Sequence, residues 1–161
     1  MPERIGAAWP RRYWGETMGT YSAFDHTADV GLAVRGRDLG DLLATAAEAV
    51  FDQVLQDRPE AVAVTETLEA RCDPALAPDA AEVLVAWLQE LLVRFETDHL
   101  VPMEVEVQEA TAERVRARVG FGRFDPARHA ARLEVKAVTY HGLEVGEAPD
   151  GSWSAQFILD V

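Results

Sequence analysis

Carboxylates gather near both ends of the chain. Phe24-Asp25-His26-Thr27-Ala28-Asp29 places two acids and a histidine in one polar bend, and Asp160 directly precedes Val161. The Asp160 side chain and the α-carboxylate of Val161 repel each other unless a cation lies near them. If the last strand pairs beside the bend, three carboxylates converge, and such an all-oxygen group suits Ca²⁺, Mg²⁺ or Mn²⁺ rather than zinc. The alternative is that Asp25 and Asp29 only support a turn and that the chain end is solvated.

Lys136 is the only lysine in the sequence, because every other basic residue among the 15 is an arginine. Arginine keeps the positive charge but carries a wide, planar group, so a site that needs a compact ammonium would resist it. We therefore treat Lys136 as a candidate functional residue. The alternative is an ordinary lysine at a sheet edge.

Two histidines, His26 and His141, could carry protons, although a hydrogen-bonded histidine in a turn is the more common case. Cys72 has no second cysteine and no nearby histidine in the sequence to suggest a nucleophile. The sequence contains no Gly-x-Ser-x-Gly, no His-Glu-x-x-His and no phosphate-binding glycine loop. Common hydrolase and nucleotide-binding motifs are therefore missing.

Hydrophobic periodicity predicts the elements that must position these residues. Alternating residues predict strands over residues 21–24, 30–34, 61–72, 103–108, 114–119 and 153–160, and a strand from Leu133 to Val145 that breaks at His141-Gly142. Apolar stripes at helical spacing predict two helices, which follow the N-caps Asp38 and Asp79. We expect an α+β fold in which two helices pack on a mostly antiparallel sheet, as a two-layer single domain.

Composition narrows the classes of function. A chain of 161 residues that is 48% hydrophobic suits one globular domain, and its net charge of −13 repels phosphate backbones. Strong direct binding of nucleic acid is therefore not expected, whereas cations and basic protein surfaces are suitable partners. The single cysteine fits a reducing cytoplasm, and no apolar run reaches membrane-spanning length. Residues 1–17 show no clear period, so we treat them as an extension of uncertain order that precedes the domain at 18–161.

Three separated motifs resemble those of the archease family. They are Phe24-Asp25-His26-Thr27-Ala28-Asp29-Val30, Lys136-Ala137-Val138-Thr139-Tyr140-His141 and Ile158-Leu159-Asp160-Val161. They occur in the family's order, and the resemblance covers about Tyr21 to Val161, which leaves the first twenty residues outside it. Three motifs together are far more specific than one.

The resemblance implies a small cytoplasmic α+β protein that activates an RtcB-type RNA ligase in tRNA splicing and RNA repair. In that role the protein promotes guanylylation and multiple turnover of the ligase and is not itself an enzyme. The resemblance also implies a divalent-metal site at Asp29, Asp160 and Val161, with Ca²⁺ as the first choice and Mg²⁺ or Mn²⁺ as alternatives. Lys136, His26 and His141 carry over as functional residues. Asp25 falls where other members often carry glutamate and receives no ligand role.

Two other functions remain open at this point. One is a stand-alone metal-dependent hydrolase of a small phosphorylated substrate, in which Lys136 would neutralise developing negative charge. The lack of a clear general base counts against it. The other is a chaperone-like adaptor for RNA-modifying enzymes, which would need an exposed apolar patch.

Overall fold

The computed structural model describes residues 19–26 and 29–161. In this part of the chain the elements follow in the order β1 (Thr20–His26), β2 (Asp29–Gly36), α2 (Leu39–Val54), β3 (Val64–Arg71), α3 (Ala80–Asp98), β4 (Leu100–Ala110), β5 (Arg114–Arg123), β6 (Ala137–Glu147) and β7 (Trp153–Asp160). The strands form two sheets, one with the order β1-β2-β7-β6 and the other with the order β3-β5-β4. Every pair of neighbouring strands in both sheets is antiparallel.

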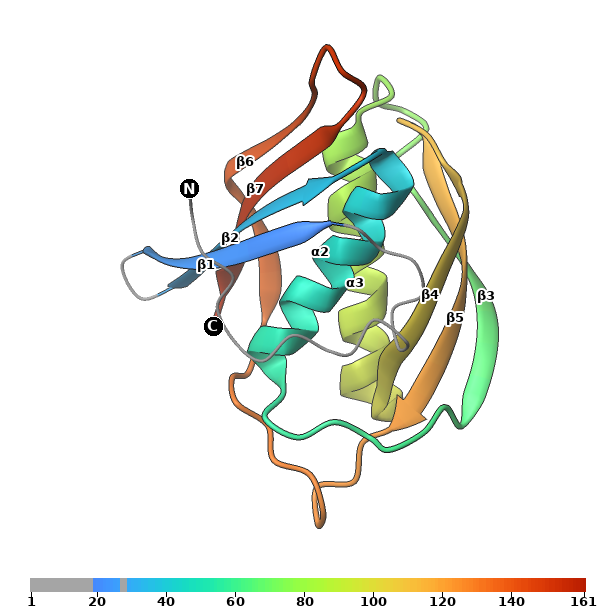
Figure 1. The fold of residues 1–161 in the computed structure, drawn as a ribbon, viewed down its shortest axis with the longest axis vertical. Helices are drawn as coiled ribbons and strands as arrows, with labels where there is room; N and C mark the ends of the chain where they lie inside the picture. The colour runs from blue at the N-terminus through green and yellow to red at the C-terminus, as the bar shows by residue number, and fades with distance from the viewer. Residues whose placement is uncertain (1–18, 27–28) are drawn as a thin grey trace.

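The two helices lie between the two sheets (Figure 1). Helix α2 contacts β2 on one side and β4 on the other, and α3 contacts β6 and β3 in the same way. The predicted α+β class, with two helices and antiparallel strands, is confirmed. The separation of the strands into two sheets was not predicted, and the second sheet adds a third layer to the expected two.

Both helices begin at the predicted N-caps. The Asp38 carboxylate accepts a hydrogen bond from the backbone N–H of Asp41 at the start of α2, and the Asp79 carboxylate accepts one from Ala81 at the start of α3. Each cap satisfies an amide that the first helical turn leaves without a partner. Trp87 is fully buried in α3, and its indole N–H donates to the Leu43 carbonyl of α2 over 2.9 Å. This bond ties the two helices together in the middle layer.

Strand β7 lies in the centre of the four-stranded sheet, although it is the last strand in the chain. It pairs with β2 from Val30↔Leu159 to Gly36↔Trp153, and with β6 on its other side. The helix-facing side of this pairing is apolar, since Leu32 and Phe157 are opposite one another and both are fully buried. The first and the last hairpin of the described chain are therefore joined through the core.

Strand β6 begins later than predicted. The expected strand from Leu133 is wrong for residues 133–136, because the ladder with β7 starts at Ala137↔Asp160. The predicted break at His141-Gly142 falls inside a register shift between Thr139 and Glu144, where Gly142 has a φ of 68°. That left-handed conformation is readily adopted by glycine, which has no Cβ. The shift separates β6 into two paired segments.

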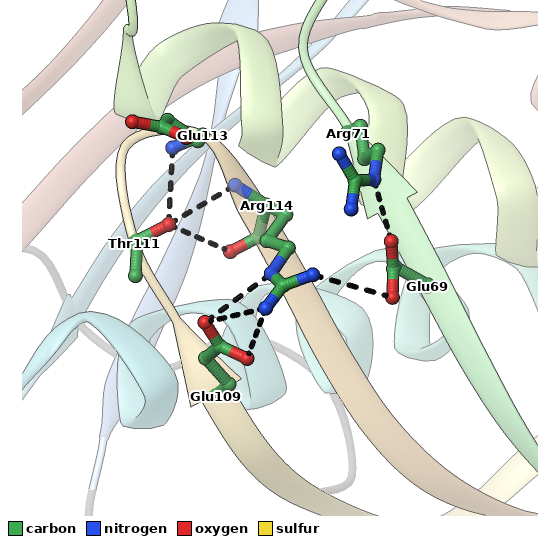
Figure 2. A network of polar contacts seen from close by, with 6 residues as sticks. All are labelled: Glu69, Arg71, Glu109, Thr111, Glu113 and Arg114. Carbon is green, nitrogen blue, oxygen red and sulfur yellow. Dashed lines mark hydrogen bonds and ion pairs between the residues drawn. The ribbon is translucent and has the colours of Figure 1, made fainter.

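The three-stranded sheet carries charge pairs on its outer face. Arg114 of β5 donates three hydrogen bonds of 3.0–3.2 Å to the two carboxylate oxygens of Glu109, and it also lies 3.9 Å from Glu69 of β3. Figure 2 shows this network beside the turn at Thr111, whose hydroxyl accepts from the N–H groups of Glu113 and Arg114. Exposed pairs of this kind contribute about 0–1 kcal/mol each. We regard this face as structural.

Two strand glycines of the four-stranded sheet provide a matched test of its packing. A Cβ at Gly31 would lie 2.1 Å from the Phe24 ring, whereas a Cβ at Gly146 would meet nothing within 4 Å. We predict that Gly31→Ala lowers the free energy of unfolding by about 1–3 kcal/mol, the usual cost of overpacking. Gly146→Ala should change it by less than about 0.5 kcal/mol. Urea unfolding of both variants checks this, and equal losses would mean that the Phe24 ring does not need the space above Gly31.

Candidate functional site

Three of the candidate site residues meet at one end of the four-stranded sheet. Asp29 is the first residue of β2 and Asp160 is the last residue of β7. The ladder pairs Val30 with Leu159, so one further step along it brings Asp29 opposite Asp160. On the other side of β7, the backbone N–H of Lys136 donates to the Asp160 carbonyl over 2.8 Å. Asp160 therefore lies between Asp29 and Lys136.

The alternation of side chains places the two aspartates on the same face of the sheet. Leu159 is fully buried on the helix-facing side, so its neighbour Asp160 points to the opposite, outer side. The same alternation holds for Val30 and Asp29 on β2. Side chains directly opposite one another in an antiparallel pair have Cβ atoms about 4.5–5.5 Å apart. Both aspartates are half-buried, so their mutual repulsion is not fully screened by water.

The end of the chain is held in place by an apolar contact. The Val161 side chain is half-buried and packs against the hydrophobic core. This contact fixes the backbone of Val161 directly after Asp160, at the same end of the sheet. The position of Val161 in the chain thus puts its α-carboxylate at the same end of the sheet as Asp160, and its role as a ligand stays a prediction.

The other candidates lie close by in the chain but contribute differently. The Lys136 side chain is exposed, and among residues 19–26 and 29–161 no ion pair involves it. His141 is exposed within the register shift of β6. The backbone of His26 pairs with Asp29 across the β1–β2 turn, while its side chain falls outside the described part of the structure. Thr27 and Ala28 also lie outside the described residues.

The donor atoms at this end of the sheet suit a hard cation. In the described part of the chain no group of three or more His, Cys, Asp or Glu side chains could hold a metal ion. Asp29 and Asp160 supply two carboxylates, and the α-carboxylate of Val161 is the third oxygen ligand that the family resemblance implies. Three carboxylates are the oxygen ligands that Ca²⁺, Mg²⁺ and Mn²⁺ prefer, and water can complete their coordination. The residues present therefore fit such a cation.

A contact next to the site attaches β6 to helix α3. The Tyr140 hydroxyl donates a hydrogen bond of 3.0 Å to the Glu82 carboxylate in the first turn of α3. Partial burial and the negative charge of Glu82 both raise the pKa of Tyr140 above its usual value. The tyrosine thus remains a neutral donor at neutral pH and holds the strand that follows Lys136.

One buried polar group was missed in the sequence. The Tyr21 hydroxyl of β1 donates to Asp52 of α2 over 2.7 Å, and the Arg58 guanidinium donates to the same fully buried carboxylate. Burial lowers the pKa of Arg58, while the hydrogen bond and charge of Asp52 oppose that decrease. The only signal in the sequence is an arginine six residues after an acid at a helix end, which is too common to be diagnostic. This group connects β1 to α2 beneath the candidate site's sheet.

The comparisons with known proteins agree on one family. The model of the archease protein family matches residues 21–161. A protein archease of Methanopyrus kandleri is 35% identical over 88% of this chain and 99% of its own length. A protein archease of Pyrococcus abyssi is 31% identical over 89% of this chain and all of its own length. The solution structure of Methanobacterium thermoautotrophicum protein 1598 has a TM-score of 0.67 and 27% identity, covering 88% of this chain and 98% of that one.

A test of the carboxylate group does not need any partner protein. We predict that Ca²⁺ raises the thermal midpoint of the chain, since a ligand at 100 times its Kd stabilises by about 2.7 kcal/mol. Asp29→Asn should remove this shift. Without metal the same variant should be more stable than the parent by about 0.2–1 kcal/mol, because like charges on opposite strands are destabilising. Glu147→Gln, the same charge change at the far end of β6, is the control, and an identical Ca²⁺ shift in Asp29→Asn would remove Asp29 from the site.

Proposed function

This chain belongs to the archease family, and on that basis we propose that it activates an RtcB-type RNA ligase in tRNA splicing and RNA repair. It promotes guanylylation and repeated turnover of the ligase in the cytoplasm, and it does not itself carry out ligation. No helix in the described residues is long and apolar enough to cross a membrane. The proposal depends chiefly on one observation, the meeting of Asp29, Asp160 and Lys136 at one end of the four-stranded sheet.

The chemistry of that end suits a protein that assists a nucleotide-transfer reaction on another protein. Lys136 is exposed directly beside the backbone of Asp160, so its ammonium can reach beyond the surface of this chain. A phosphate group of a nucleotide or a carboxylate of the ligase would be a suitable partner for a compact point charge. The residue would then act in the ligase's site rather than in a pocket of its own.

Asp29, Asp160 and the α-carboxylate of Val161 would hold the divalent cation. When bound, such an ion neutralises the carboxylates and supplies a Lewis acid for phosphate oxygens. The chain's own contribution is positional. The β2–β7 ladder sets the spacing of the two aspartates, and the packing of the Val161 side chain on the core supports a role of its α-carboxylate as the third ligand.

The overall charge supports a basic partner. A net charge of −13 attracts a protein that binds RNA through a basic surface and speeds the encounter between the two. The same charge opposes direct binding of RNA to this chain. The charge therefore favours an activator that docks on the ligase over one that binds the RNA first.

A stand-alone hydrolase is the competing function, and one experiment separates the two. The protein is incubated with GTP, RNA ends and metal, with and without an RtcB-type ligase. Activation predicts no turnover without the ligase and faster formation of the ligase–GMP adduct when both proteins are present. Nucleotide hydrolysis by the chain alone, lost in Asp29→Asn, would favour the hydrolase.

Lys136 offers a prediction about the shape of the positive group. We predict that Lys136→Arg folds with an unchanged thermal midpoint, because an exposed position accepts either side chain. It should nevertheless reduce guanylylation of the ligase at limiting activator, since the guanidinium is wide and planar. Arg123→Lys, at an exposed position on the three-stranded sheet, is the matched control. Full activation by Lys136→Arg would mean that only the positive charge at position 136 matters, and not the shape of the group that carries it.

The α-carboxylate of Val161 gives a second prediction. A short Gly-Ser extension after Val161 moves this carboxylate away from Asp160 but leaves every side chain unchanged. We predict weaker Ca²⁺ binding by calorimetry and weaker activation of the ligase, whereas the same extension before Met1 should be tolerated. Equal binding and activity of the two extended proteins would mean that the chain end has only a structural role.

A further inference from the structure

A hollow of about 840 Å³ lies over all four strands of the four-stranded sheet. It is on the face turned away from the helices (Figure 1), because the residues that alternate with its lining, Tyr21, Val34 and Ala155, are buried in the core on the other face. Its volume is typical of a pocket for a small molecule. We call it the outer hollow, and its outward-pointing residues include Ser22, Ala33, Arg35, Glu144, Gly146 and Gln156.

The outer hollow contains a buried hydroxyl without a partner. Ser22 belongs to the outer face, since Tyr21 before it donates to Asp52 of α2 on the helix side. Ser22 is only 2% exposed, and its hydroxyl has no hydrogen-bond partner among residues 19–26 and 29–161. Ala33 is opposite Ser22 on β2, and its short side chain cannot supply one. A hydroxyl removed from water without a partner is costly, so it indicates a place for a polar group of a ligand.

Two opposite charges line the same hollow. Arg35 of β2 and Glu144 of β6 are both exposed, and neither forms an ion pair within the described part of the chain. Asp150 in the β6–β7 turn acts on Arg35 only at longer range and accepts two hydrogen bonds from Ser152. A ligand that carries both a carboxylate and an ammonium group would match this pair of charges.

The strand ladders set the distance between the two charges. Arg35 is opposite Ser154 and Glu144 is opposite Gln156, with β7 between β2 and β6. Two strand spacings and two residues therefore separate Arg35 from Glu144, which places their Cα atoms about 12 Å apart. Three extended residues span about 10 Å. The two ends of a tripeptide thus come within reach of both side chains.

We propose that the outer hollow binds a short zwitterionic peptide of about two or three residues, with its α-carboxylate on Arg35 and its α-ammonium on Glu144. The peptide's amide groups supply the hydrogen bond that Ser22 lacks, and the Gln156 side chain offers both a donor and an acceptor. Gly146 leaves room for the ligand, since a Cβ there would meet nothing within 4 Å. A nucleotide is a poorer match, because Glu144 repels its phosphates.

The outer hollow is separate from the carboxylates at the end of the sheet. Gln156 precedes Asp160 by four residues, which is about 13–14 Å along β7. Between them, the outward-facing Ile158 is only 4% exposed, and the Phe24 ring covers Gly31 on the strand opposite. Peptide binding here therefore depends neither on the cation nor on activation of the ligase.

An NMR titration of the metal-free chain with tri-alanine tests the proposal. Backbone amides around the outer hollow should shift, and tri-alanine should bind about two- to fivefold more tightly than its N-acetylated or its C-amidated form. Arg35→Gln should bind tri-alanine and the amidated form equally, and Glu144→Gln should bind tri-alanine and the acetylated form equally. Arg118→Gln and Glu106→Gln, at exposed positions of the three-stranded sheet, should keep both preferences.

Two further variants test the hollow itself. Gly146→Val places a side chain in open space, so it should weaken binding and leave the thermal midpoint unchanged. Ser22→Ala removes a hydroxyl that has no partner in the described chain, so the variant should fold and bind less tightly. Equal affinity for the three forms of the peptide, preferences that survive in Arg35→Gln and Glu144→Gln, or unchanged binding by Gly146→Val would overturn the proposal.

Discussion

The pairing of β2 with β7 is the constraint on which the rest of this molecule depends. It joins the first hairpin of the described chain to the last, and its helix-facing residues are in the centre of the core. Because side chains alternate between faces, a slip of β7 by one residue against β2 would move Phe157 out of the core and turn Asp160 inward. The hydrophobic cost of that slip fixes the register. The position of Asp160 relative to Asp29 is thus a consequence of core packing, not of any attraction between them.

The sequence predicted the structure best where that structure depends only on residues within one helix or strand. The N-caps Asp38 and Asp79 and the apolar stripes behind them predicted both helices, because capping and periodicity act within a few residues. The start of β6 could not be predicted in this way. Residues 133–136 alternate as well as any strand, but they lack a partner, since β7 ends near Asp160. Strand pairing depends on residues far away in the chain, and alternation alone does not contain that information.

The same limit applies to the candidate site and to α2. The sequence predicted the approach of Asp29 to Asp160 only if the last strand pairs beside the bend at residues 25–29. Nothing local in the sequence shows which strand the last strand pairs with. The apolar stripe of α2 was predicted, but the burial of the acidic residues Glu48 and Asp52 on the same helix was not, and both are nearly inaccessible. The outer face of the three-stranded sheet shows the ordinary case, in which Glu and Arg residues remain near water (Figure 2). Burial, not composition, distinguishes the two surfaces.

The single lysine has a practical consequence. Because Lys136 is exposed and is the only lysine in the protein, an amine-selective reagent modifies one side chain, and the α-amine of Met1 is the one other primary amine in the sequence. A fluorophore or photoreactive group attached through an activated ester would therefore stand at the end of β7, beside Asp160, without any engineered residue. Light-induced attachment from that point would identify whatever surface faces this end of the sheet. The composition of the chain thus provides a built-in probe of its own contact partner.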